Sequence, residues 1–175
     1  MAIYTLLTKS PQFGANCFVA PQAVIIGDVI TGAQCSFWFH AVVRGDVNTI
    51  RIGNRVNIQD HAMLHGTYQK TSLQIGDDVS IGHRAIVHGC TIESKVLIGM
   101  GAIVMDHCHV EPYTIIAAGA VLTEHTRTET GWIYAGTPAK KIKPVSEALK
   151  QGEIERIAKN YILYSSWYNE CNVLK

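Results

Sequence analysis

Three histidines stand at breaks in an otherwise regular apolar sequence, and their residue type is that of a metal ligand: His65, His83 and His88. Three neutral imidazoles with a fourth position left open form the ligand set of a zinc centre that hydrates or hydrolyses its substrate. His83 and His88 are five residues apart, whereas neighbours on one face of a strand are two apart. The spacing therefore favours ligands on different walls of the fold or on different subunits. Histidines that are buried and hydrogen-bonded at a subunit contact are the alternative.

Charged and amide residues form two further motifs, Arg44-Gly45-Asp46 and Asn57-Ile58-Gln59-Asp60. We expect both motifs to lie in the same region of the fold. If Ile58 points into the core, Asn57 and Gln59 share the opposite face of their strand. An arginine and a carboxylate in this region could pair bidentately across an interface. A solvent-exposed charged turn is the alternative.

The elements that hold these residues are predicted by a six-residue period. Large apolar residues recur at every sixth position, and smaller residues recur with the same period at an offset of four. The larger column contains Ile86, Ile92, Ile98, Val104, Val110, Ile116 and Leu122, and the smaller one contains Cys90, Val96, Ala102, Cys108, Thr114 and Ala120. Neither the turn of an α-helix nor the alternation of a strand gives this phase. A hexapeptide repeat indicates a parallel β-helix, so the predicted fold class is mainly β.

The repeat covers most of the chain and is interrupted at three places. The same two columns begin near residue 17 and keep their offset in every block. The interruptions are residues 44–50, 66–73 and 83–84. In a solenoid, inserted residues leave the coil as loops on one face, and that face commonly binds ligands. We therefore expect loops at these interruptions.

After Leu122 the repeat fades, and the sequence predicts a different C-terminal region. Residues 135–143 are interpreted as a compact linker, and Ser146 is a suitable N-cap for a helix. An apolar stripe at helical spacing predicts this helix at about residues 146–170, packed on the solenoid or on a neighbouring subunit. The predicted domains are a β-helix over residues 1–143 and a helical region over residues 144–175.

Composition argues against several classes of protein. A net charge of +1 without a basic stripe gives no basis for nucleic-acid binding. No segment has the roughly 20 apolar residues of a membrane span, and the start lacks the pattern of a secretion signal. We therefore expect a cytoplasmic protein without a membrane partner. Cys17, Cys35, Cys90 and Cys108 fall in the smaller column, where we expect them to be buried as small hydrophobic residues.

The other histidines have a simpler interpretation. We expect His40 and His61 to face solvent or an interface, and His125 to lie on the surface. His107 and His109 flank an inward cysteine, and strand alternation points both away from it, which argues against a metal site there.

The ordered set of motifs resembles the γ-class carbonic anhydrases and their bacterial hexapeptide-repeat relatives, the "isoleucine patch" group of carbonic anhydrases and acetyltransferases. The matching segments are IIGDV at 25–29, AVVRGD at 41–46, RIG at 51–53, NIQD at 57–60, LH at 64–65, IGH at 81–83, VHGC at 87–90, IGMGA at 98–102 and AGTPA at 135–139. The resemblance spans about residues 10–145. It implies a left-handed β-helix and a homotrimer, neither of which follows from the period alone.

The resemblance also implies a metal held between subunits. Its ligands would be His65 and His88 of one subunit and His83 of the neighbour. The metal at each subunit interface would be zinc, ferrous iron or cobalt, all of which accept imidazole ligands. Gln59 would hydrogen-bond the metal-bound solvent, and Asn57 would help to shape the site.

The implied reaction is the reversible hydration of carbon dioxide to bicarbonate by metal-bound hydroxide. The resemblance pairs Arg44 with Asp60 across the subunit interface, with Asp46 in support. The archetypal members carry glutamates for proton transfer in two loops, but the corresponding residues 47–49 and 66–72 contain no carboxylate here. We therefore expect slow turnover.

Three other functions stay open. The first is a CoA-dependent acyltransferase of the same repeat superfamily, although the catalytic histidine of those enzymes generally stands on a longer loop than residues 66–73. The second is a non-catalytic, metal-bound trimer that serves as a scaffold or accessory subunit. Hydrolysis of CoA thioesters would also use a metal-bound hydroxide. Tyr161 and Tyr164 on the predicted helix could reach a neighbouring site.

Overall fold

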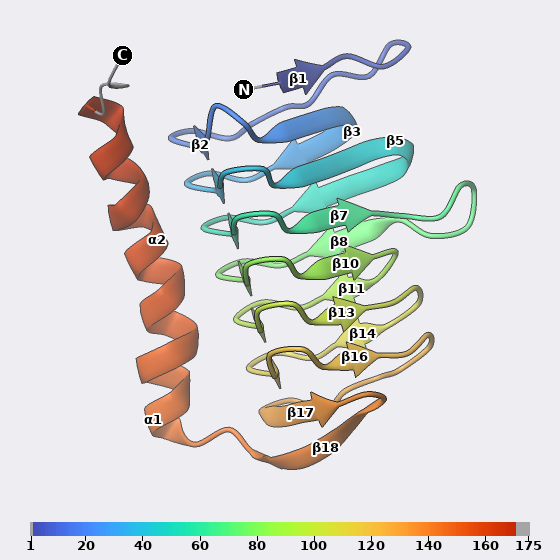
Figure 1. Cartoon of the computed structure of the whole chain (residues 1–175), viewed down its shortest axis with the longest axis vertical. Coiled ribbons are helices and arrows are strands. Elements are labelled where there is room, and N and C mark those ends of the chain that lie inside the picture. Colours follow the sequence, from blue (N-terminus) through green and yellow to red (C-terminus); the bar gives the residue numbers. More distant parts are fainter. Residues whose placement is uncertain (1, 171–175) are drawn as a thin grey trace.

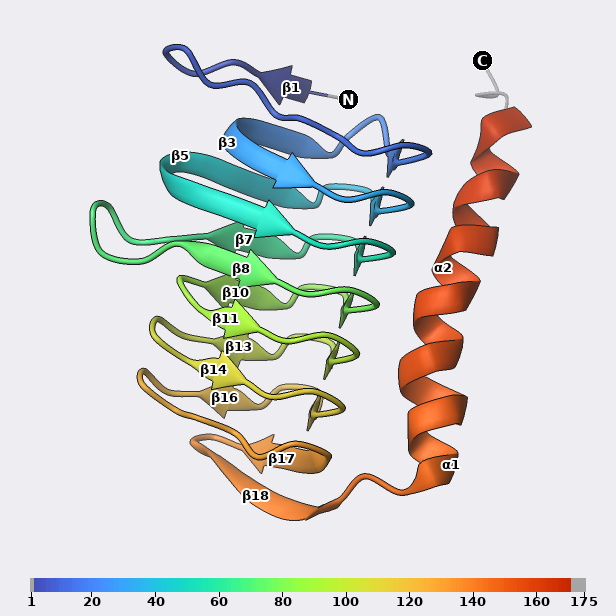
Figure 2. The same ribbon diagram turned by 180° about the vertical axis from the view of Figure 1, so that it is seen from behind.

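The computed structural model describes residues 2–170 and has the predicted left-handed parallel β-helix, with one C-terminal helix along its side (Figure 1). Short strands stack coil on coil from the N-terminal end to the C-terminal end, as the reverse view also shows (Figure 2). Each regular coil contributes one strand to each of three faces. The inward side chains of all three faces form one continuous core.

The strands fall into three rows, which we call faces one, two and three. Face one contains β7 (Met63–His65), β10 (Ile86–His88), β13 (Ile103–Val104) and β16 (Val121–Leu122). Face two contains β8 (Leu73–Ile75), β11 (Thr91–Ile92) and β14 (His109–Val110). Face three contains β2 (Phe18–Val19), β4 (Ser36–Phe37), β6 (Asn57–Ile58), β9 (Ser80–Ile81), β12 (Leu97–Ile98), β15 (Ile115–Ile116) and β17 (Trp132–Gly136). The long strands β3 (Val24–Thr31) and β5 (Val42–Ile52) run across faces one and two, and β1 (Ala2–Tyr4) pairs with β3.

The two predicted columns form the core, with one exception. Ile98 from the larger column and Ala102 from the smaller one are both fully buried. Burying a large aliphatic side chain stabilises the fold by about 1.5–3 kcal/mol, so the columns are its main source of stability. The prediction is wrong for Ile86, which is 38% exposed and points outward, while Val87 is fully buried and points inward. Because Val87 and Ile92 are only five residues apart, the period shifts by one residue at this point.

The first predicted loop is wrong. Residues 44–50 stay within β5, which pairs with β3 along most of its length. The extra residues are absorbed by a shift in register, since Gly27 pairs with Gly45 whereas Val29 pairs with Ile50. Continued pairing of the backbone with β3 therefore keeps this insertion in the wall of the solenoid.

Of the other two predicted interruptions, only residues 66–72 leave the coil as expected. Residues 66–72 form a loop that projects beyond the coil between β7 and β8 (Figure 1). His83 and Arg84 form a tight turn between β9 and β10, with Arg84 in the left-handed region at a φ of 59°. Ile81 and Val87 are both fully buried and six residues apart, so this turn is a regular corner of the coil and the break predicted at residues 83–84 is wrong.

The C-terminal region begins with a hairpin where a linker was expected. Strands β17 and β18 (Ala139–Pro144) pair antiparallel and close the end of the solenoid (Figure 1). The helical region comprises α1 (Glu147–Leu149), a π-helical segment (Lys150–Glu155), α2 (Arg156–Ser166) and a 3-10 segment (Trp167–Glu170). The predicted N-cap is confirmed, because the Ser146 hydroxyl accepts a hydrogen bond from the Leu149 amide at 3.3 Å.

The helix packs along face three of its own chain. Ile154 and Ala158 are almost fully buried, which confirms the apolar stripe predicted from helical spacing. Tyr161 packs edge-on against Trp38 with 5.2 Å between ring centroids. Within residues 2–170, faces one and two carry no covering helix (Figures 1 and 2).

Two further expectations concern the burial of the cysteines and a membrane span. Cys35, Cys90 and Cys108 are at most 2% exposed, and Cys17 is partly buried against the core. Residues 171–175 of the predicted helical region, which include Cys171, lie outside the described part of the chain. Every helix within residues 2–170 is too short or too polar to span a bilayer.

Candidate metal centre

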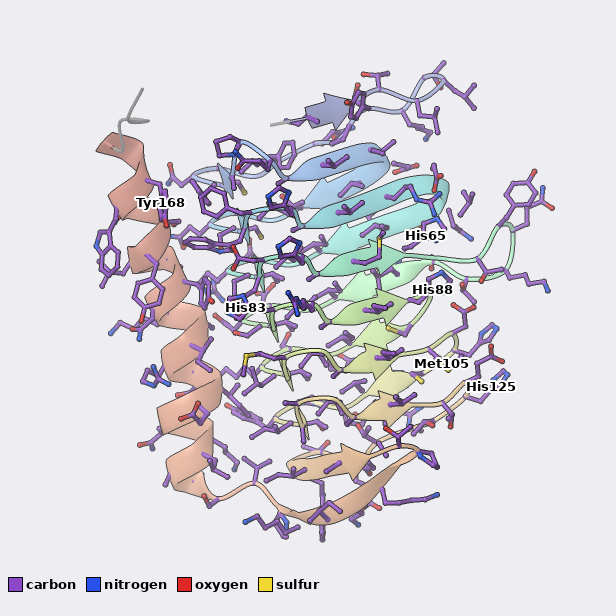
Figure 3. All side chains as sticks on the ribbon, viewed as in Figure 1. His65, His83, His88, Met105, His125 and Tyr168 are labelled. Carbon is purple, nitrogen blue, oxygen red and sulfur yellow. The ribbon has the colours of Figure 1, made fainter. Side chains whose placement is uncertain are left out.

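His65 and His88 lie side by side at the same edge of face one. They end strands β7 and β10, whose parallel register makes them direct partners. His65 Nδ1 is 3.1 Å from His88 Nε2. Both side chains lie on the same side of the strands (Figure 3). Two ring nitrogens therefore face one small space, as two ligands of one metal ion would.

Each of these two rings is held at its other nitrogen by a carboxylate. Asp46 Oδ1 is 2.9 Å from His65 Nε2, and Asp106 Oδ1 is 2.7 Å from His88 Nδ1. A carboxylate in this position fixes the orientation and tautomer of the ring and makes the opposite nitrogen a better metal ligand. The four residues form one column across successive coils, which we call the histidine column: Asp46, His65, His88 and Asp106.

The electrostatics of the histidine column favour a neutral imidazole beside an ionised carboxylate. Burial lowers the pKa of His65, and this effect outweighs the hydrogen bond to Asp46, which acts in the opposite direction. Burial alone would raise the pKa of Asp46, but hydrogen bonds with Arg44 and His65 bring it below its ordinary value. Metal binding requires neutral imidazole, so His65 is in the protonation state that a metal needs.

Asp106 is a supporting residue that the sequence interpretation missed. The hydroxyls of Thr67 and Thr71 donate to it at 2.6 and 3.1 Å, so it ties the 66–72 loop to His88. Burial acts to raise the pKa of Asp106, but the hydrogen bonds from Thr67 and His88 give a net lowering. The period gives no signal for Asp106, because β10 and β13 pair with a separation of 17 residues, which places Met105 rather than Asp106 in register with His88.

Replacing Asp106 by alanine should lower the zinc affinity of the protein by about 10- to 100-fold, which is typical for loss of a residue that holds a metal ligand. The 66–72 loop should also become more sensitive to protease. Calorimetric titration and limited proteolysis measure the two effects. Asp78→Ala is the matched control, because it breaks an ion pair with Arg55 at a different corner. Equal zinc affinity in the two variants would contradict this role of Asp106.

His83 lies at the opposite edge of face one. It stands in the turn before β10, its Nδ1 is 2.8 Å from Asp60 Oδ2, and its side chain is 42% exposed. Figure 3 shows His83 on the helix side of the strands, away from His65 and His88. One chain therefore does not bring the three predicted ligands together. Among residues 2–170, no three His, Cys, Asp or Glu side chains form a group that could hold a metal.

Asn57 and Gln59 belong to the same half of the site as His83. Gln59 Nε2 donates to Asn57 Oδ1 at 2.9 Å, and Asn57 Nδ2 donates to Ser80 Oγ at 2.8 Å. This confirms that the two amides share one face, and both are buried. Gln59 and His83 line a cavity of about 340 Å³ between face three and the helix. The buried amides are thus fixed beside an accessible imidazole.

Tyr161 and Tyr164 line the same cavity from the helix of their own chain. Burial raises the pKa of Tyr161 to about 12, with further contributions from Asp60 and Tyr164. The Tyr161 phenol therefore keeps its proton at neutral pH. It can donate a hydrogen bond in the cavity but cannot act there as a base.

The two polar motifs lie in different halves of the site. Arg44 forms a salt bridge with Asp46, and its Nη2 is 3.4 Å from His65 Nδ1, whereas Asp60 binds His83. The expectation that the two motifs share one region is therefore wrong for the single chain. The ion pair between Arg44 and Asp60 stays a prediction about a pair of chains.

Known proteins resemble this chain in both sequence and fold. A family model described as bacterial transferase hexapeptide (six repeats) matches residues 89–124. A carbonic anhydrase of Geobacillus kaustophilus is 39% identical over 95% of this chain and 90% of its own length. The mitochondrial gamma carbonic anhydrase 2 of Arabidopsis thaliana is 39% identical over 91% of this chain and 59% of its own length. The chain belongs to the γ-carbonic anhydrase family of hexapeptide-repeat proteins.

Some solved structures that are similar to this γ-carbonic anhydrase family member are named as transferases. A hexapeptide transferase family protein from Anaplasma phagocytophilum is 36% identical with a TM-score of 0.88, covering 95% of this chain and 98% of that one. Relatives with the same fold are thus named both as carbonic anhydrases and as transferases. Membership of the γ-carbonic anhydrase family supports an enzyme-like protein, and the choice of reaction depends on the site.

Proposed function

We propose that this protein catalyses the reversible hydration of carbon dioxide to bicarbonate at a metal site shared between the subunits of a homotrimer. The arrangement of three histidines along face one carries the proposal. His65 and His88 stand at one edge and His83 stands at the other, and each has one ring nitrogen on a carboxylate. The 39% sequence identity with proteins named carbonic anhydrase supports the same reaction.

The donor set fits a divalent metal. Three imidazoles suit zinc, ferrous iron or cobalt. Tetrahedral zinc with Zn–N bonds of about 2.05 Å separates two ligand nitrogens by about 3.3 Å. His65 Nδ1 and His88 Nε2 are already 3.1 Å apart. When bound, the metal would supply a Lewis acid that lowers the pKa of water towards neutrality.

The outward side of face one supports contact between two copies of the chain. The strand register aligns one outward residue from each coil, and every one is apolar: Ala2, Val24, Val42, Met63, Ile86, Ile103 and Val121. We call this set the face-one stripe. Ile86 is exposed and the other six are partly exposed, and an aligned apolar row of this kind is typical of a protein–protein contact.

A second copy of the chain is the partner that suits the face-one stripe, because the stripe lies between the two half-sites. Contact between the His65 and His88 edge of one copy and the His83 edge of the next is head-to-tail, and such contacts can close into a ring. A ring of three would hold one metal at each interface. Arg44 of one copy and Asp60 of the next would then meet, and an arginine–carboxylate pair adds both strength and orientation.

Side chains of the protein would bind and orient the reactants in this shared site. The Gln59 amide, fixed by Asn57, would hydrogen-bond the reacting water at the interface. Asn57 is itself held by Ser80, so the amide network does not need to reorganise during the reaction. The three carboxylates on the histidines keep the imidazoles in their ligand orientation.

Two other functions have some support. CoA-dependent acyl transfer is favoured by the similarity to a hexapeptide transferase family protein. Against it, the three carboxylate-held histidines match a metal site, whereas acyl transfer would need only one of them. A metal-bound trimer without catalytic activity is favoured by the missing carboxylates in residues 47–49 and 66–72.

Metal analysis and a hydration assay test the proposal. Protein prepared without oxygen and without chelator should contain about one metal per chain, because each site takes three ligands. Stopped-flow measurements should detect carbon dioxide hydration that is lost in His65→Ala. Metal-free protein that binds acetyl-CoA tightly would contradict the proposal in favour of the transferase. A full metal content without any hydration would contradict it in favour of the scaffold.

A further inference from the structure

Hydration of carbon dioxide releases a proton that must reach bulk solvent. Carbon dioxide and water give bicarbonate and one proton, so the proton must leave in every turnover. The loops at residues 47–49 and 66–72 contain no carboxylate that could accept it. If the proposed function holds, other residues must therefore carry the proton away from the site.

A stacked pair of histidines lies at the same edge as the histidine column. The rings of His107 and His125 are 4.7 Å apart between centroids and only 3° from parallel. Both residues are exposed, and both occupy left-handed corner positions, with φ of 60° and 62°. Figure 3 shows His125 on the same side of the strands as His65 and His88. The stack therefore stands in solvent beside the candidate ligands.

Backbone hydrogen bonds fix the position of this stack relative to the site. The His107 amide donates to the carbonyl of Gly89, the residue after His88, at 2.9 Å, and the His125 amide donates to the carbonyl of Asp106 at 3.1 Å. His107 is thus one coil from His88, and His125 is two coils away. With about 4.8 Å between neighbouring strands, the backbones of the two residues lie roughly 5 and 10 Å along the axis from that of His88. One or two bridging water molecules can span such distances.

We infer that His107 and His125 carry the product proton from the site to bulk solvent. A ring nitrogen of His107 or His125 gains the proton through bridging water as the O–H bond of the reacting water breaks. The imidazolium then gives the proton to a buffer base and returns to its neutral form. Histidine suits this task because its charge changes near neutral pH. Asp106, next to His107, is already hydrogen-bonded to His88 and to the two loop threonines, so it does not compete for the proton.

A second stacked pair provides a matched control within the same chain. The rings of His40 and His61 are 4.9 Å apart and 9° from parallel, and both residues are exposed in the single chain. His61 follows Asp60, which binds His83 and which we assign to the subunit interface. The pair would therefore be enclosed between subunits, where exchange with bulk water is restricted.

Exchange of oxygen-18 between carbon dioxide, bicarbonate and water separates the chemical step from proton transfer. Interconversion of carbon dioxide and bicarbonate needs no proton from bulk solvent, whereas release of labelled water from the site does. With His107 and His125 both replaced by alanine, interconversion should change by less than about twofold and labelled-water release should fall at least about tenfold in dilute buffer, since positioned proton-transfer groups contribute roughly 100- to 10,000-fold. Imidazole buffer should restore the release. In the double variant His40→Ala, His61→Ala, labelled-water release should fall no more than interconversion does, because this pair takes no part in proton transfer to bulk solvent.

The possible failures of this experiment are distinguishable. Wild-type rates of labelled-water release in the His107→Ala, His125→Ala variant would overturn the inference. A lower metal content in this variant would also overturn it, since the two residues would then have a structural role at the site. A wild-type protein that carries its metal but does not interconvert carbon dioxide and bicarbonate would overturn the proposed function instead.

A second measurement needs no metal. Diethyl pyrocarbonate modifies accessible imidazoles, and peptide mass spectrometry locates each modified ring. In the metal-free assembly, the reagent should modify His107 and His125 faster than His40 and His61. Slower modification of His107 and His125 would show that they do not face bulk solvent in the assembly, and the inference would be wrong.

Discussion

Replacing His83 by alanine should remove the metal from the assembled protein and leave each chain folded. The variant lacks one of three ligands, so its zinc affinity should fall by more than the roughly 10- to 100-fold typical of a residue that only supports a ligand. The His83 side chain is 42% exposed, and its polar contact is with Asp60 at the surface. The free energy of unfolding of the metal-free chain should therefore change by less than about 0.5 kcal/mol. Elemental analysis and denaturant unfolding of metal-free protein measure the two quantities.

His109→Ala is the matched control for this variant. His109 lies on face two, and its ring pairs with Glu93 and Glu111 rather than with a candidate ligand. Its loss should leave the metal content unchanged. A full metal content in His83→Ala would mean that this residue is not a ligand, and the shared site would be ruled out.

Replacing Ile86 by lysine should separate the assembly into folded single chains that bind no metal. Ile86 lies in the middle of the face-one stripe and is 38% exposed, so the chain itself does not depend on its burial. In the assembly a lysine at this position would be removed from water without a partner, at a cost of several kcal/mol for each copy. Light scattering gives the mass of the particle, and elemental analysis gives the metal content of the same sample.

Ile30→Lys is the control with the same chemistry on another face. Ile30 is also 38% exposed and lies on β3, away from the face-one stripe. This variant should keep both the assembly and the metal. A trimeric Ile86→Lys protein with full metal would place the interface elsewhere, and dissociation of Ile30→Lys alone would place it on face two.

The architecture could be predicted because its cause is local and repeated. A hexapeptide period sets the side chains that point inward, and burial of Ile98 and Ala102 follows from it directly. The error at Ile86 has the same origin, because one five-residue step changes which neighbour points inward. Residues 44–50 stay in a strand because they pair with β3. This contact joins residues that are distant in the sequence, and the period does not encode it.

The site could be predicted only in part from the residues. Histidine type and the breaks in the period identified His65, His83 and His88. Their spacing does not show that His65 and His88 are register partners, because the 66–72 loop adds five residues to a coil of 18 and makes their separation 23. Asp106 was missed because it lies in a regular part of the repeat, where the period gives no signal of a polar role.

The most direct test of the shared metal site mixes two inactive variants. In His65→Ala trimers and in His83→Ala trimers, every interface lacks one ligand, so neither protein should retain metal. A trimer that contains both chains has one interface where His65 and His88 of a His83→Ala chain meet His83 of a His65→Ala chain. After denaturation, mixing and refolding, purified mixed trimers should therefore bind one metal each and recover carbon dioxide hydration in proportion. Mixed trimers that bind no metal would contradict the shared site.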